Sequence, residues 1–431
     1  MVSGCRHHST SPAEGLPADS TALLKAIFRD PVECSPCHPD HYAQWQMSMH
    51  AYALADPVFL ALNETGQRRS NNQLGQFCTK CHSPLGPALN ETPAGFNPDA
   101  LTPLVKHGVH CDVCHLIADF SGGDGVAQFH FDGIRRGSIE DPVGNSVHES
   151  EFDQRFGLSA MCQPCHDVLA PDKSMLIERT STEWDESPYA GMGLECQDCH
   201  MPASDGPAAP GGPVRQVHDH RMVGADFPLV DFPGKEETIV RVAKLLSNAI
   251  TLKVQSSETI RPGELLSFAV SVQNDKTGHS IPSGNTVDRQ MWIQALVTDE
   301  DSGELIFATG LLGDNGDLLN HNSESVTSGL VPEDGNLVLF NTVAYDRNDQ
   351  ETHFFWEAQR LEHNIIPAFE THTSNFEVQV PGSVGRMRMD VRLLFRAFPP
   401  YLLHEIGLQH LQSELRIFEM AAVTRVINVT D

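Results

Sequence analysis

The sequence predicts an α+β multidomain protein, in which a mostly helix and loop region is followed by an antiparallel β-sandwich. Two observations predict this division. The first 200 residues hold five copies of Cys-x-x-Cys-His, and none follows them. From about residue 236, apolar and polar residues alternate in several runs, which is typical of half-buried strands. We therefore expect a flexible N-terminal tether (1–20), a helix and loop domain (21–235) and a β domain (236–431).

The five motifs predict the cofactor. Their residues are Cys34, Cys37 and His38; Cys78, Cys81 and His82; Cys111, Cys114 and His115; Cys162, Cys165 and His166; and Cys196, Cys199 and His200. Cys-x-x-Cys-His is the attachment motif of c-type haem, in which the thiols bind the macrocycle and the imidazole binds the iron. Zinc ribbons use two Cys-x-x-Cys pairs per metal and need no histidine after each pair. Iron–sulfur runs need a third cysteine at close spacing, which this sequence lacks, and a thioredoxin-like site uses a single pair. We expect five covalently attached haem c groups in a pentahaem domain.

The β domain is predicted from its period-2 runs. Apolar residues alternate with polar ones at 250–254, 266–272 and 387–395. Runs of this kind between Asp, Asn and Gly loops favour an immunoglobulin-like sandwich of roughly 190 residues. A short helix near 401–409 is expected to interrupt it. In the first domain, we expect a helix over 42–54 and a shorter one over 180–189.

The net charge and the hydropathy of the sequence limit the classes of partner that the protein is expected to bind. The net charge is −28, which disfavours nucleic acid and anionic lipid surfaces and favours cationic redox partners. No run of about 18 apolar residues predicts a transmembrane helix. Cys5 ends Val2-Ser3-Gly4-Cys5, which is similar to the end of a bacterial lipobox, although only four residues precede it. We expect either a lipid anchor at Cys5 or an unmodified terminal cysteine.

Several segments carry a family resemblance. They are Cys37-His38 with Tyr42, Trp45, Ser48 and His50-Ala51, then 108–115, 162–168, 183–189 and 196–202. In these segments the chain resembles multihaem cytochromes grouped with the tetrahaem cytochrome of ammonia oxidisers. The segment 278–284 is similar to a C-terminal domain appended in some of them. The resemblance implies closely packed bis-histidine haems that transfer electrons outside the cytoplasm, and some of these cytochromes assemble into extracellular filaments.

The sixth ligand of each iron decides between two functions. A second imidazole closes the iron to substrates and suits an electron carrier, whereas an open position permits chemistry on a small molecule. The predicted distal ligands are His50, His110, His148, His220 and His279. His279 lies in a Gly/Pro loop of the β domain, so it would dock that domain onto a haem. His107 is an alternative to His110 as a distal ligand. His41, His130 and His218 are further candidates for that role.

The expected function is electron transfer without a substrate of the chain's own. The partners would be other cytochromes or an extracellular electron acceptor, or further copies of the chain in a homopolymer. Because haem attachment of this kind occurs outside the cytoplasm, we expect an exported protein that is periplasmic, outer-membrane-anchored or extracellular. The alternative is a nitrite- or hydroxylamine-type reductase with one five-coordinate haem, although a Cys-x-x-Cys-Lys motif is absent.

Two further features of the sequence give weaker indications of function. Arg135 and Arg136 could pair with haem propionates, since guanidinium binds carboxylates bidentately, or could lie in a solvated surface. Residues 314–317, Asp-Asn-Gly-Asp, predict a turn rather than a calcium loop.

Overall fold

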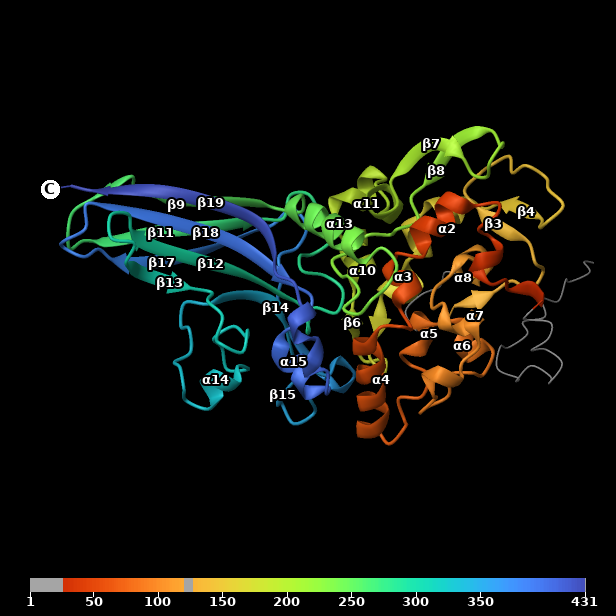
Figure 1. Cartoon of the computed structure of the whole chain (residues 1–431), viewed down its shortest axis with the longest axis horizontal. Helices are drawn as coiled ribbons and strands as arrows, with labels where there is room; N and C mark the ends of the chain where they lie inside the picture. The colour runs from red at the N-terminus through yellow and green to blue at the C-terminus, as the bar shows by residue number, and fades with distance from the viewer. Residues whose placement is uncertain (1–25, 120–126, 431) are drawn as a thin grey trace, which may run out of the picture.

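The computed structural model describes residues 26–119 and 127–430. The predicted tether up to residue 20, with Cys5, lies outside the described residues. Figure 1 shows the helices up to α12 in one half of the molecule and the long strands in the other half, with α13 between them. The chain is therefore a mixed α+β protein with a helical region and a β region.

Short helices with loops between them make up the first region. Its helices are α2 (Pro39–Trp45), α3 (Met49–Tyr52), α4 (Pro57–Arg69), α5 (Thr79–His82), α6 (Leu85–Ala88), α7 (Pro103–Lys106), α8 (Cys111–His115), α9 (Gln163–His166), α10 (Thr180–Asp185), α11 (Pro188–Met192) and α12 (Cys196–His200), with 3₁₀ turns η1 (Pro31–Glu33), η2 (Pro98–Ala100), η3 (Gln154–Gly157) and η4 (Ser159–Met161). Its longest helix, α4, starts at Pro57, and the Asp56 side chain accepts a hydrogen bond from the Val58 N–H at 2.9 Å. That pairing is a typical helix start, because proline and a capping carboxylate both suit the first turn.

The expected single helix over 42–54 is wrong. The chain forms α2 and α3 instead, and the two are separated at Ser48, whose backbone is extended. The Ser48 hydroxyl accepts a hydrogen bond from the Ala51 N–H at 3.2 Å, so it caps a new helix rather than continuing the old one. The segment 180–189 is divided in the same way, with Ser187 extended before Pro188.

Four two-stranded sheets brace this region. They are formed by β1 (Ile117–Asp119) with β2 (Gln128–Phe129), β3 (Arg135–Gly137) with β4 (Ser150–Phe152), β5 (Val168–Leu169) with β6 (Leu176–Glu178), and β7 (Ala203–Pro207) with β8 (Val214–His218). Only the β3–β4 pair is parallel among these four.

The β region follows α13 (Lys235–Ser247). Its strands are β9 (Thr251–Ser256), β10 (Thr259–Ile260), β11 (Leu265–Gln273), β12 (Gln290–Asp299), β13 (Leu305–Thr309), β14 (Val338–Tyr345), β15 (Glu351–Thr352), β16 (Arg360–Asn364), β17 (Thr371–Gln379), β18 (Arg386–Arg396) and β19 (Phe418–Val429). The short elements between them are α14 (Glu324–Thr327), α15 (Pro400–Glu405), η5 (Phe355–Glu357) and η6 (Gln409–Glu414). The expected interruption near 401–409 is thus present as α15.

These strands form two sheets. One has the order β10-β19-β18-β12-β14-β15, with β13 also on β12 and β16 on β14, and the other has the order β17-β11-β9. The expected alternation holds along β18, where Met387, Met389, Val391 and Leu393 are fully buried. These side chains share one apolar core with Phe268 of β11, so the two sheets pack against each other through it.

The same core continues into the helical region. Val58 of α4 and Leu74 belong to it together with Trp356 of the β region. Beside them, the Arg69 guanidinium binds both carboxylate oxygens of Glu357 at 2.7 and 2.8 Å. The two regions are therefore joined by apolar packing and by ion pairs.

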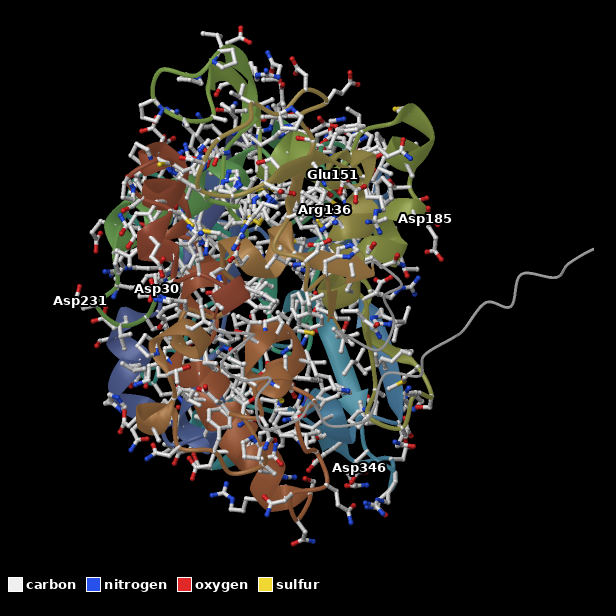
Figure 2. The ribbon with its side chains drawn as sticks, turned by 90° about the vertical axis from the view of Figure 1, so that its right-hand side faces the viewer. Asp30, Arg136, Glu151, Asp185, Asp231 and Asp346 are labelled. Carbon is white, nitrogen blue, oxygen red and sulfur yellow. The ribbon has the colours of Figure 1, made fainter. Side chains whose placement is uncertain are left out.

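Acidic side chains are spread over the surface. Figure 2 shows Asp231 at one side of the molecule, Asp185 at the opposite side and Asp346 near the bottom. Among the described residues, no helix is both long enough and apolar enough to cross a bilayer.

Candidate haem-binding site

Each Cys-x-x-Cys-His motif forms a single helical turn. The second to fifth motifs lie at α5, α8, α9 and α12, and the first lies in the turn between η1 and α2. The backbone N–H of His38 donates to the Cys34 carbonyl at 2.8 Å, and His166 donates in the same way to Cys162 at 3.1 Å. Because positions i, i+3 and i+4 are neighbours on a helix, each turn presents two sulfurs and one imidazole to the same side.

Four of the five motif histidines face a second histidine at almost the same separation. The ring centroids are 6.3 Å apart for His38 and His148. They are 6.4 Å apart for His166 and His50, for His115 and His220, and for His200 and His279. Each partner was predicted from the sequence as a distal ligand, and each comes from a segment remote from the motif that it faces.

This separation fits an iron between two imidazoles. A histidine nitrogen binds a transition metal at roughly 2 Å, and the ring centre lies about 1 Å further out. Two such ligands on opposite sides of one metal place their ring centres about 6 to 6.5 Å apart. The four pairs have this spacing, so their residues fit a six-coordinate haem.

Hydrogen bonds at Nδ1 orient the motif imidazoles. His38 donates to the Ala208 carbonyl at 2.7 Å, His115 to the Arg136 carbonyl at 2.6 Å, His200 to the Val223 carbonyl at 2.7 Å and His82 to the Ala53 carbonyl at 3.1 Å. His166 differs, because its Nδ1 lies 3.4 Å from a carboxylate oxygen of Glu178. A proton held at Nδ1 leaves Nε2 free for a metal, as is usual for ligating histidines.

The facing histidines are oriented in the same way. Nδ1 of His148 contacts the Glu149 carbonyl at 3.1 Å, that of His220 the His218 carbonyl at 2.8 Å and that of His279 the Ser280 carbonyl at 2.8 Å. His50 places Nδ1 2.8 Å from the Met222 sulfur. Burial lowers the pKa of His50 and of His279 to about 4, and that of His220 to about 3. These imidazoles are neutral at physiological pH, which is the form that binds metals.

The ring planes divide the pairs into two kinds. The planes lie 20° apart for His200 and His279, 21° for His115 and His220, and 31° for His38 and His148. The planes of His50 and His166 lie 72° apart. One pair is therefore close to perpendicular and three are closer to parallel.

His279 reaches its partner from the β region. Its loop is held against α10, where the Glu183 carboxylate accepts hydrogen bonds from the Ser280 N–H at 3.2 Å and the Ser283 hydroxyl at 2.7 Å. At Gly278 an added Cβ would lie 2.8 Å from the Tyr189 ring, so only glycine permits this close approach. The loop is thus fixed to the helical region independently of any haem.

His82 is the exception. Among the described residues, no histidine ring faces it at the spacing of the other pairs, and Phe59 stacks on its ring at 4.0 Å with an interplanar angle of 14°. The predicted ligand His110 faces no motif histidine in the described part of the chain; its nearest histidine ring is that of His107, 6.5 Å away. His110 is 1% exposed, and burial lowers its pKa to about 4. Neither of its ring nitrogens has a hydrogen-bond partner within the described ranges.

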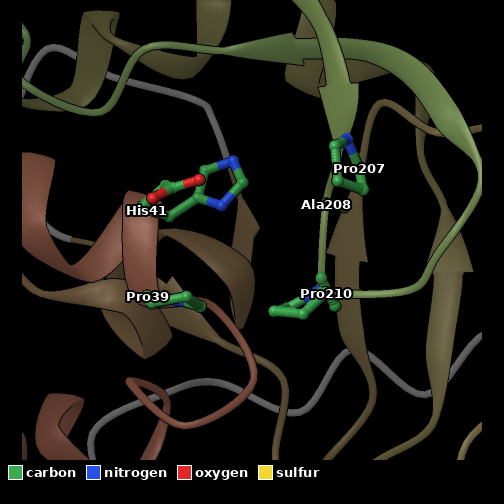
Figure 3. Close-up of a pocket in the computed structure, with 7 residues that line it drawn as sticks. Pro39, His41, Pro207, Ala208 and Pro210 are labelled. Atoms are coloured by element: carbon green, nitrogen blue, oxygen red, sulfur yellow. The ribbon is translucent and has the colours of Figure 1, made fainter.

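The other candidate histidines make contacts that do not fit a metal between two rings. His107 uses Nε2 to contact Asp30 at 3.2 Å. His41 lies 6.1 Å from His38, but it touches His220 edge-on at 4.7 Å. His218 contacts the Met201 carbonyl at 2.7 Å, and His130 faces no motif histidine in the described structure. His41 also lines a shallow pocket with Pro39 and Pro207–Pro210, as Figure 3 shows.

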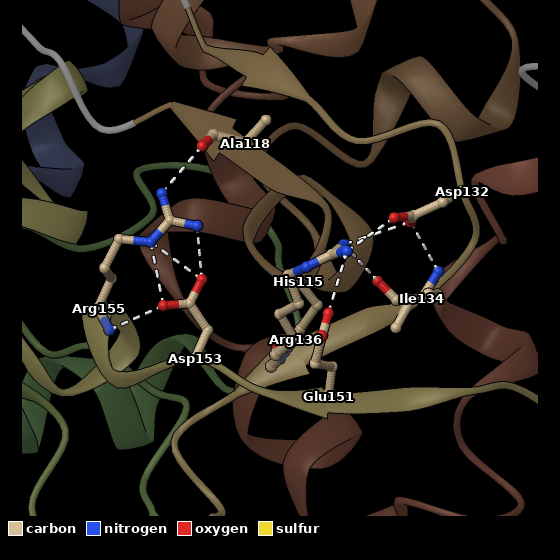
Figure 4. Close-up of polar contacts among 8 residues, drawn as sticks. All are labelled: His115, Ala118, Asp132, Ile134, Arg136, Glu151, Asp153 and Arg155. Carbon is tan, nitrogen blue, oxygen red and sulfur yellow. Dashed lines mark hydrogen bonds and ion pairs between the residues drawn. The ribbon is translucent and has the colours of Figure 1, made fainter. Parts of the chain in front are cut away.

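The arginines predicted for propionates are already bound by protein carboxylates. Arg135 contacts both oxygens of Asp112 at 3.0 and 2.8 Å. Arg136 binds Asp132 at 2.7 Å and Glu151 at 3.2 Å, and its carbonyl accepts the His115 hydrogen bond (Figure 4). The sequence analysis assigned no role to Glu178, Glu183 or Met222, although Glu183 begins one of the segments that resemble the cytochrome family. The contacts of these residues depend on which loops meet in the folded chain.

The cysteines of different motifs lie beside one another. The side chains of Cys34 and Cys111, of Cys81 and Cys165, and of Cys162 and Cys196 lie close enough to perturb each other's pKa. Cys114 also interacts electrostatically with Cys162 and Cys165. The fourth motif is therefore the neighbour of the second, the third and the fifth.

The sequence matches a known family of multihaem cytochromes over part of its length, in agreement with the arrangement of the motifs. The family described as cytochrome c554 and c-prime matches residues 33–116, which contain the first three motifs. Together with the five motifs, this match supports a multihaem c-type cytochrome. Proteins of this class are typically exported and pass electrons to redox partners.

The fold is also found in a solved structure. The chain is similar to a penta-heme cytochrome c552 from Thermochromatium tepidum, with a TM-score of 0.64 at 19% identity over 93% of this chain and 99% of that one. A CARDB domain from Pyrococcus furiosus matches with 10% identity over 42% of this chain and 87% of that one, but its TM-score of 0.19 is too low to indicate a shared fold. No curated protein matches the sequence.

Proposed function

We propose that the chain is a pentahaem electron conduit in which four haems have two histidine ligands each. The observation that carries this proposal is the uniform spacing of four histidine pairs at 6.3 to 6.4 Å. A haem held in this way would supply one-electron transfer, and the two imidazoles of each pair would leave no site on its iron for another ligand. In the proposed sites, the histidines at 38 and 148, 115 and 220, 166 and 50, and 200 and 279 are the ligands.

The cysteine contacts support a connected path. Each motif cysteine would hold the edge of a haem, so neighbouring cysteines from different motifs would bring two haems close together. The contacts place the first motif beside the third, the third beside the fourth, and the fourth beside the second and the fifth. Electrons entering near Cys34 would reach the fourth motif through the third and could leave toward either of two ends.

A second function is favoured by His82. Because no imidazole faces it among the described residues, its haem would have an open axial position. Such a haem can bind a small ligand, so a reductase acting on nitrite or hydroxylamine is the alternative function. In the conduit, the same haem would instead be one end of the branched path.

The remaining parts of the proposal concern the setting of the protein. The exported chain would lie in the periplasm, on the outer membrane through Cys5, or outside the cell, and it would exchange electrons with other cytochromes or with an extracellular acceptor. Self-assembly into a filament would require a ligand or contact from a second copy. The β region would be an immunoglobulin-like sandwich that supplies His279, within the domain limits 21–235 and 236–431.

The test counts haems and open positions. The pyridine haemochrome assay should give five haems per chain. Carbon monoxide should then bind one additional haem in His50→Ala, because His166 would lose its facing ligand. The matched variant His110→Ala should bind the same amount as the wild type, since His110 faces no motif histidine. Equal carbon monoxide binding by His50→Ala and the wild type would refute the ligand assignment.

A further inference from the structure

The carboxylate beside His166 is brought there by a short hairpin. Strand β5 begins two residues after His166, and it pairs with β6 so that Val168 lies opposite Glu178. This register returns Glu178 to the motif, with an oxygen 3.4 Å from Nδ1 of His166. The Glu178 side chain is 22% exposed, so its charge is partly shielded from water.

The other four motif histidines lack such a partner at Nδ1. His38, His82, His115 and His200 all contact neutral backbone carbonyls through that atom. A carboxylate at Nδ1 makes the imidazole a stronger electron donor than a carbonyl does, because it draws the proton further from the ring. One of five sites is thus electronically distinct, although the sequence of its motif resembles the others.

That site is also the most connected one. The fourth motif contacts the second through Cys81 and Cys165, the fifth through Cys162 and Cys196, and the third through Cys114. Glu178 acts electrostatically on Cys81 and His82 of the second motif as well. A change at Glu178 would therefore affect the point through which every route in the proposed network passes.

We propose that Glu178 is a positioning residue that holds the His166 imidazole and lowers the midpoint potential of the haem attached to Cys162 and Cys165. This proposal rests on the ligand assignment in the proposed function. The step concerned is the one-electron reduction of ferric to ferrous iron, in which the proton stays on Nδ1 of His166. The negative charge of Glu178 stabilises the ferric state over the ferrous state, because the ferric iron carries one more positive charge.

The test uses the near-perpendicular rings of His50 and His166. Perpendicular imidazole planes leave two iron d orbitals nearly equal in energy, so this haem should give a strongly anisotropic low-spin EPR signal. The three pairs with angles of 20° to 31° should give ordinary rhombic signals. The full-length holoprotein is titrated with dithionite in the presence of mediators, and the anisotropic signal is followed at each potential.

Three variants separate charge from position. Glu178→Gln keeps an oxygen near Nδ1 and removes the charge, so the ratio of ferrous to ferric iron at this haem should rise about tenfold at a fixed potential. That ratio corresponds to a shift of about 59 mV for a one-electron couple. Glu178→Asp keeps the charge and should shift the ratio less. The exposed Glu186, which pairs with Arg179 at 3.0 Å, provides the control Glu186→Gln, which should leave the ratio unchanged.

The outcomes distinguish this inference from the function on which it rests. A selective shift of the anisotropic signal in Glu178→Gln supports the role of Glu178. If the signal is present but shifts no more than in Glu186→Gln, the role of Glu178 is wrong and the ligand pair stands. If the wild type gives no strongly anisotropic signal, the pairing of His50 with His166 fails, and the proposal for Glu178 fails with it.

Discussion

Replacing His279 tests whether the β region supplies a haem ligand. In the His279→Ala variant, His200 loses the ring that faces it at 6.4 Å, and the other three pairs keep theirs. One haem in five should therefore change from low-spin to high-spin and become reactive toward carbon monoxide. The change should be confined to this haem if the loop stays docked.

The contacts around the loop indicate that it does stay docked. Glu183 accepts hydrogen bonds from Ser280 and Ser283, Thr180 shares one with Ser283 at 2.8 Å, and the Gly284 N–H donates to Thr180 at 3.1 Å. Each such bond contributes about 1 kcal/mol, so the four together contribute roughly 4 kcal/mol. That energy corresponds to a factor of about 10³, and nearly all molecules would keep the loop in place without the ligand.

The assay is low-temperature EPR of the oxidised variant, with carbon monoxide titration of the reduced variant. The exposed His404, which contacts Gln412 at 2.8 Å, gives the control His404→Ala. The reasoning predicts one additional carbon monoxide per chain in His279→Ala and none in the control. If His279→Ala binds no more than the wild type, His279 is not a ligand, and the inferred link between the two regions is wrong.

Three further predictions follow from the same structure. Gly278→Val should push the loop away from Tyr189, where an added Cβ would lie at 2.8 Å, and it should produce the same spectral change as His279→Ala. Phe268→Ala should destabilise the protein by about 3 to 5 kcal/mol in denaturant unfolding, because it leaves a cavity in the shared core. Burial raises the pKa of Asp288 to about 7, so this group keeps a proton in the folded state that the unfolded state releases above pH 4, and it lowers stability by up to about 4 kcal/mol between pH 4 and 7. Because other buried groups titrate in the same range, the test is the difference between the two proteins: the free energy of unfolding of Asp288→Asn, relative to the wild type, should rise by up to that amount from pH 4 to pH 7. Equal slopes in Asp288→Asn and the wild type would contradict this account.

The sequence was sufficient for the residues whose role is local. Cys-x-x-Cys-His needs only one helical turn, so all five motifs could be recognised, and haem attachment predicted at each, before the fold was known. The period-2 runs likewise identified β11 and β18, because alternation along a strand reflects which side is buried. Local propensity failed at Ser48, where a side-chain cap ended a helix that the apolar spacing predicted would continue.

The pairing of the histidines could not be predicted from the sequence. His50 faces His166 and His148 faces His38, although more than 100 residues separate each pair in the chain. Which imidazole reaches which motif depends on how loops cross in the folded molecule. For the same reason, the predicted ligand His110 has no motif histidine facing it in the described part of the chain, and the contact of Glu178 with His166 could not be predicted.

The most direct test of the central claim is the number of open haems in the wild-type holoprotein. Low-temperature EPR of the oxidised protein and carbon monoxide titration of the reduced protein measure it together. We expect four low-spin haems that do not bind carbon monoxide, and no more than one haem, at His82, that does. Binding of two or more carbon monoxide molecules per chain would contradict the four histidine pairs and, with them, the proposed electron conduit.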